Sequence, residues 1–220
     1  MTTEAASRSE VRRAGIVVVV GALLYVLSDL AELFGLIENL YRLPEADRLA
    51  ALEANRTAWD ISRGLAGIGL VIAAVGLFML GRAVARAAAD DRSRVMATVA
   101  GWAGAATGLW AISSFLSVVR PAEDVVAALE EPTVDVIVTG LIYLVGVVVL
   151  FVALGLTLRR LGHKRTLGWS LIFVGTLAAL SMPVFGALLP SMVMLALGIG
   201  MAADPYPPPN RSPNTELAST

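Results

Sequence analysis

The chain has 220 residues, of which 57% are hydrophobic and 16% are charged, with 17 basic against 18 acidic side chains. Because an average soluble domain carries about 25% charged residues, this low share argues against a water-soluble domain, and the near-zero net charge argues against a nucleic acid partner. No cysteine and only one histidine are present, which excludes disulfides, thiolate metal sites and a His-rich zinc site, so we expect neither a metal nor another cofactor.

Four long apolar runs follow the first dozen residues. A helix that crosses about 30 Å of hydrocarbon needs roughly 20 apolar residues. The runs lie at 14–36, 59–81, 95–119 and 134–158. The first run is longer than the roughly 7–15 apolar residues of a cleaved signal peptide, so we interpret it as a retained helix behind a short cytoplasmic segment, 1–13.

The next apolar stretch, 167–203, is too long for one span. Pro183 and Pro190 lie near its middle, and proline disfavours a continuous helix. We therefore expect two shorter helices, at 167–182 and 187–203. They bring the total to six spans, whereas a single kinked helix would give five.

These runs define the expected fold class, an all-α polytopic transmembrane helix bundle. Its transmembrane domain covers 14–203. The polar, proline-rich tail at 204–220 is expected to be disordered.

Basic side chains predict the orientation of the bundle. Cytoplasmic loops of membrane proteins carry an excess of Lys and Arg. Three segments on one side hold Arg8, Arg12 and Arg13; Arg82, Arg86, Arg92 and Arg94; and Arg159, Arg160, Lys164 and Arg165, whereas the other side holds only Arg42, Arg48, Arg56 and Arg120. The chain is therefore expected in the plasma membrane with a cytoplasmic N-terminus, and with six spans the C-terminus is cytoplasmic too. The clusters after the second and fourth spans should also attract anionic lipid headgroups.

Two short helices are expected in the outer loops. The segments PEADRLAALEANRT at 44–57 and PAEDVVAALEE at 121–131 each begin with proline followed by acidic residues. Proline and negative charge both favour the first turn of a helix. We interpret the two segments as extracytoplasmic surface helices, with a lid over a ligand as the alternative.

Small residues mark expected helix-packing faces, because helices in lipid associate where their backbones can approach closely. Gly69 and Ala73 share one stripe of the second span. The third span has a ridge that contains a GxxxG pattern and consists of Ala97, Gly101, Gly104 and Gly108. We expect packing within the chain, with a homo-oligomer or another membrane protein as the alternative partner of these faces.

Charged side chains gather at the outer ends of the spans, where burial of a charge costs several kcal/mol and needs a compensating interaction. The group consists of Asp29, Glu32, Asp60, Arg63 and Asp135, with Tyr25 one turn before Asp29. One interpretation is static, with Arg63 paired to Asp29, Glu32 or Asp60. The other is an outward-facing acidic pocket for a cation or a small cationic or zwitterionic solute.

No Walker-type phosphate loop and no HExxH motif occur in the sequence, and no histidine is placed to activate a serine. We therefore expect a non-enzymatic multi-span membrane protein, embedded in the lipid bilayer, that acts in assembly, sensing or stabilisation of a partner. The alternative is a small transporter or channel component that uses the acidic pocket. The richness in Ala, Val, Leu and Arg resembles that of small bacterial membrane proteins, but no motif indicates a family.

Overall fold

The computed structural model describes residues 3–33, 40, 43–88, 90–161, 165–182 and 187–205. These residues are almost entirely helical and contain no strand. The expected all-α fold is therefore confirmed for the described part of the chain. Three expected features lie outside it: residues 183–186 between the last two expected helices, Lys164 of the basic cluster, and most of the expected disordered tail.

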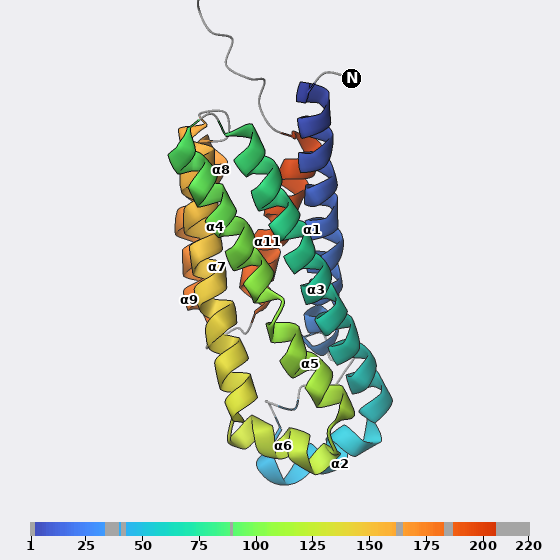
Figure 1. Cartoon of the computed structure of the whole chain (residues 1–220). Helices are drawn as coiled ribbons and strands as arrows, with labels where there is room; N and C mark the ends of the chain where they lie inside the picture. The colour runs from blue at the N-terminus through green and yellow to red at the C-terminus, as the bar shows by residue number, and fades with distance from the viewer. Residues whose placement is uncertain are drawn as a thin grey trace, which may run out of the picture.

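Four helical segments are long and apolar enough to cross a membrane. They belong to α1 (Thr3–Leu33), α3 (Arg56–Ala87), the pair α4 (Asp91–Thr107) and α5 (Trp110–Val119), and α7 (Val134–Arg160). Figure 1 shows these helices running alongside one another, with α1 against α3 and α4 against α7. They coincide with the first four expected spans.

Two further apolar helices are shorter. One is formed by α8 (Arg165–Ser170), the π-helical turn η2 (Leu171–Gly175) and α9 (Thr176–Leu180), and the other is α11 (Leu188–Ala203). With 16 residues, α11 is about 24 Å long, less than the roughly 30 Å of hydrocarbon. The two helices lie in the half of the bundle that contains the N-terminus (Figure 1).

The third expected span is interrupted where a single helix was predicted. The backbone N–H groups of Gly108 and Leu109 donate to the carbonyls of Ala105 and Ala106, three residues earlier, which is the tighter 3₁₀ pattern. Glycine favours helix less than other residues, and here a Cβ on Gly108 would lie 2.8 Å from the Ala74 Cβ of α3. The close approach of α3 thus requires glycine where the helix changes.

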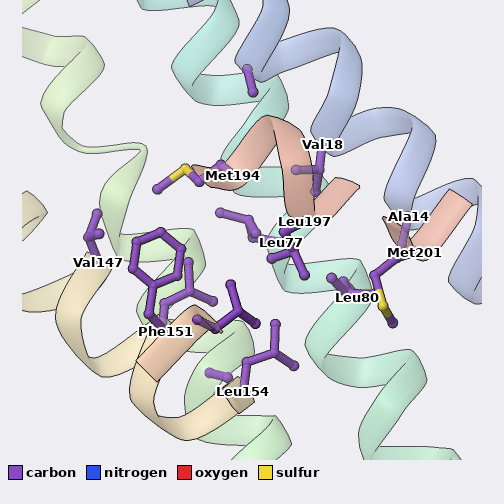
Figure 2. Packing of buried hydrophobic residues seen from close by; sticks show 14 of the residues in the cluster. Ala14, Val18, Leu77, Leu80, Val147, Phe151, Leu154, Met194, Leu197 and Met201 are labelled. Atoms are coloured by element: carbon purple, nitrogen blue, oxygen red, sulfur yellow. The ribbon is translucent and has the colours of Figure 1, made fainter. Parts of the chain in front are cut away.

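Apolar side chains from four helices fill the bundle interior near the N-terminal end. Val18 from α1, Leu77 from α3, Phe151 from α7 and Leu197 from α11 are almost completely buried. Figure 2 shows them pointing into one shared space, together with Leu80, Leu154 and Met194. The short helix α11 therefore contributes to the same core as the long ones.

Several of the expected small residues lie at backbone contacts between helices. A Cβ on Gly21 of α1 would lie 2.2 Å from the backbone N of Ala73 and 2.6 Å from the carbonyl O of Gly69. A Cβ on Gly81 would lie 2.4 Å from the Cα of Gly101 and 2.7 Å from the carbonyl O of Ala97.

Gly104 belongs to the same contact between α3 and α4, since a Cβ there would lie 2.6 Å from the Cβ of Leu77. The ridge of the third span is therefore occupied by α3 within the chain. At these positions it leaves no space for a second copy.

Two short helices, α2 (Glu45–Ala54) and α6 (Ala122–Glu130), lie at the opposite end of the bundle from the N-terminus (Figure 1). They occupy the two segments where short helices were expected. Around them is a small apolar cluster, separate from the main core, that consists of Leu40, Leu52, Trp59 and Val125. Arg48 of α2 forms an ion pair with Glu130 of α6, with 3.7 Å from Nη1 to Oε1.

Candidate functional site

Four of the five charged residues expected at the outer end, all but Asp29, take part in three separate ion pairs. The first joins α1 to α3: the Arg63 guanidinium donates to the Glu32 carboxylate. Only 18% and 9% of these two side chains are exposed. The guanidinium also lies over the Trp59 ring, 4.3 Å from its centroid. Arg63 thus adopts one of the static pairings expected for it.

The second pair joins Arg56 to Asp60 one turn later on α3, with 2.9 Å from Nε to Oδ1. Arg56 Nη2 also donates to three carbonyl oxygens at the end of α5, those of Ser117, Val118 and Arg120, at 3.2, 2.7 and 2.9 Å. The last carbonyls of a helix lack partners within it. Arg56 donates hydrogen bonds to these carbonyls and so connects the start of α3 to the end of α5.

The third pair joins Arg120, which follows α5, to Asp135 in the first turn of α7, with 3.0 Å from Nη2 to Oδ1. From the sequence, Arg56 and Arg120 were expected only as loop charges. The spacing of four residues between Arg56 and Asp60 was a usable signal for the second pair. The third pair had no such signal, because its partners are 15 residues apart and meet only through the turn formed by α6.

Asp29 differs from the other carboxylates. No described residue forms an ion pair with it, and it is half-buried on α1, one turn after the buried side chain of Tyr25. On the same stretch of α1, the Ser28 hydroxyl donates to the Ser62 carbonyl on α3 at 2.8 Å and lies 2.7 Å from the Ser62 hydroxyl. The polar contacts between α1 and α3 thus extend one turn beyond Glu32 toward the N-terminal end of α1.

The basic residues expected at the cytoplasmic surface lie where α3 and α7 end and α4 and α8 begin, at the N-terminal end of the bundle (Figure 1). Arg86 pairs with Glu10, with 3.0 Å from Nη1 to Oε1, and Arg94 pairs with Asp91, with 2.9 Å from Nη1 to Oδ1. Arg159 stacks on Trp169, with 3.6 Å from its Cζ to the ring centroid. The side chains of Arg82, Arg92, Arg160 and Arg165 are exposed.

Within the described residues, no cluster of three or more histidine, aspartate or glutamate side chains could hold a metal ion. Comparison with protein-family models, with curated proteins and with solved structures finds no match to this chain. The function must therefore be argued from the geometry alone.

Proposed function

We propose that this chain is a multi-pass protein of the plasma membrane with its N-terminus in the cytoplasm. Four apolar helices of sufficient length support this topology. So does the charge distribution: basic side chains gather at the N-terminal end of the bundle, and the acidic first turns of α2 and α6 lie at the other. In this topology α2 and α6 are surface helices on the extracytoplasmic side.

The two shorter helices complete the topology as a pair that starts and ends on the cytoplasmic side. Basic residues before α8 and the position of both helices in the N-terminal half of the bundle support this arrangement. A reporter fused at 82–94 and a second one fused after residue 205 should both be cytoplasmic. An extracellular signal from either reporter would contradict the proposal.

The role we propose is non-enzymatic, in assembly, sensing or stabilisation of a membrane partner. The observation that carries it is that arginines form ion pairs with Glu32, Asp60 and Asp135. These three carboxylates are therefore engaged within the protein. An acidic pocket for a cation needs carboxylates that are available to the solute. Paired carboxylates instead hold helices together.

The test is reconstitution of the purified chain into lipid vesicles with a panel of inorganic cations and small amines. We expect no flux above that of empty vesicles. The Glu32→Gln and Arg63→Gln double variant should change thermal unfolding in detergent and leave the flux unchanged. Flux in the wild type that is lost in Glu32→Gln would overturn the structural role.

A transporter is the second candidate, and Asp29 favours it. A carboxylate inside a membrane helix is costly, and such groups commonly mark solute or proton pathways. The chain has no native cysteine, so single cysteines introduced along α1 can report water access. Labelling of Ser28→Cys by a membrane-impermeant thiol reagent would support the transporter, whereas labelling that stops at Glu32→Cys would support the structural role.

A further inference from the structure

A partly open cavity of about 130 Å³ lies beside the ion pairs, bordered by α3, α5, α6 and the start of α7. Its polar wall includes Trp59 and Arg63 from α3, Ser113 from α5, and Arg120. A second indole, that of Trp110, forms part of its apolar wall, and α6 covers it with Leu129. Its size approaches that of the roughly 150 Å³ protein cavity that admits benzene.

The lining is rich in hydrogen-bond donors. Guanidinium and indole groups donate hydrogen bonds and cannot accept them. Trp59 is only 3% exposed, and its Nε1–H has no acceptor among the described residues. A buried donor without an acceptor is costly, so a guest that brings an acceptor would be stabilised there.

Among the residues that the structure describes, no aspartate or glutamate lines this cavity. The carboxylates that balance Arg63 and Arg120 are Glu32 and Asp135, and neither of them lines it. The two ion pairs therefore present their cationic members to the cavity. A cationic guest would face these guanidiniums, whereas an anionic guest could receive charge-assisted hydrogen bonds from them.

We propose that this cavity binds a small organic carboxylate, with its charged group toward Arg63, Arg120 and the Trp59 N–H and its apolar part against the indole of Trp110. This inference goes beyond the proposed function, because neither the topology nor a partner role requires a ligand. It also assigns an anionic ligand to this end of the molecule, where the acidic residues had suggested a cationic one.

The first experiment uses the full-length wild type in detergent and three probes of one shape: benzoate, benzamide and benzylammonium. A ligand that binds the folded state raises the thermal unfolding temperature, and tryptophan fluorescence reports contact with Trp59 and Trp110. We expect benzoate to change both signals, benzamide to act more weakly and benzylammonium to have no effect. Equal effects of all three probes, or no effect of benzoate, would overturn the proposal.

The second experiment compares two charge-neutral double variants. Arg120→Gln with Asp135→Asn removes an ion pair at the cavity, and Arg48→Gln with Glu130→Gln removes one at the same end of the molecule whose members do not line it. We expect the first to weaken benzoate binding about tenfold or more and the second to leave it unchanged. Equal affinities of the two variants would contradict the assignment.

A third variant keeps every charge and tests whether benzoate needs the volume of the cavity. Ser113→Leu places a larger apolar side chain in the cavity wall. It should abolish the benzoate effect on fluorescence and on unfolding temperature while the protein remains folded. Retained binding in Ser113→Leu would show that benzoate binds elsewhere.

Discussion

The two ends of the bundle are held together by different interactions. Toward the N-terminus, helices meet through apolar side chains and through direct backbone contact at glycines. A Cβ on Gly15 would lie 2.8 Å from the backbone N of Ala202, and a Cβ on Gly155 would lie 2.6 Å from the carbonyl O of Gly168. At the other end, arginines join helices through carboxylates and helix-end carbonyls. In lipid, apolar burial alone does not hold helices together, so close packing and polar contacts must do so.

This difference decides how each end can be damaged. At the N-terminal end the contact distance depends on missing side-chain atoms, so the harmful change is the addition of an atom. At the other end each interaction needs two charged members, so the harmful change is the removal of one of them. The predictions below test this contrast.

The largest effect is expected from breaking the pair between Glu32 and Arg63. Glu32→Gln or Arg63→Gln should each lower the free energy of unfolding by about 3 kcal/mol, because the remaining charge is buried without its partner. The double variant should recover a substantial part of the loss, since it leaves no unpaired charge. Chemical unfolding in detergent measures all three variants.

The control is the pair between Arg86 and Glu10 at the N-terminal end, whose side chains are 60% and 41% exposed. Water screens an exposed pair, so Glu10→Gln should cost at most about 1 kcal/mol. If Glu10→Gln and Glu32→Gln were equally destabilising, burial would not be what gives the outer pair its strength.

The next effect concerns the contact between α1 and α3. Gly21→Ala should destabilise the protein by about 1–3 kcal/mol, because its Cβ would lie 2.2 Å from backbone and the two helices would have to separate. Gly64→Ala on α3 is the matched control, since a Cβ there meets nothing within 4 Å. Alanine favours helix over glycine by about 1 kcal/mol, so the control should be neutral or stabilising. Thermal unfolding in detergent separates the two outcomes.

The long helices could be predicted from sequence because length and hydropathy are local properties of a segment. The packing role of Gly69 and Ala73 follows from the same kind of local signal. The interruption at Gly108 could not be predicted, because it depends on the approach of Ala74 from another helix. The short length of the last two helices was visible from the same local signal, because two shorter helices were expected at 167–182 and 187–203.

The candidate site was predictable in composition but not in pairing. The sequence identified the acidic groups of the outer end, which are Asp29, Glu32, Asp60 and Asp135. Which arginine each carboxylate meets depends on helix rotation and on the turn through α6, neither of which the sequence states. This is why an acidic pocket stood beside static pairing as an alternative there, whereas one cavity found at this end is lined by Arg63 and Arg120.

A smaller effect is expected at the hydrogen bond between α1 and α3. Ser28→Ala removes a donor to the Ser62 carbonyl and should cost about 0.6 kcal/mol, the average for hydrogen bonds between membrane helices, and at most about 1.7 kcal/mol. In Ser181→Ala the lost bond runs to Ala178 just before it in the chain, so no contact between distant helices is removed. Equal effects of the two variants on unfolding would mean that the bond between α1 and α3 adds nothing specific.

The smallest effect is expected at the N-terminal end, where Asp90 caps α4 outside the spans. The nearby Ser93 hydroxyl and the hydrogen bond from the Ser93 backbone N–H lower the pKa of Asp90. A carboxyl whose pKa is lower in the folded state stabilises that state above its ordinary pKa and loses this contribution as the pH falls through the folded value.

The comparison of wild type with Asp90→Asn therefore depends on pH. Asparagine keeps the acceptor and lacks the charge, so the wild type should unfold at a slightly higher temperature at neutral pH. This difference should shrink as the pH falls below the ordinary pKa of aspartate and vanish once Asp90 is protonated in the folded state. Asp90→Ala, which lacks the acceptor, should unfold at a lower temperature than both at every pH. A difference between wild type and Asp90→Asn that persists unchanged into acid would show that the carboxylate charge does not act through this cap.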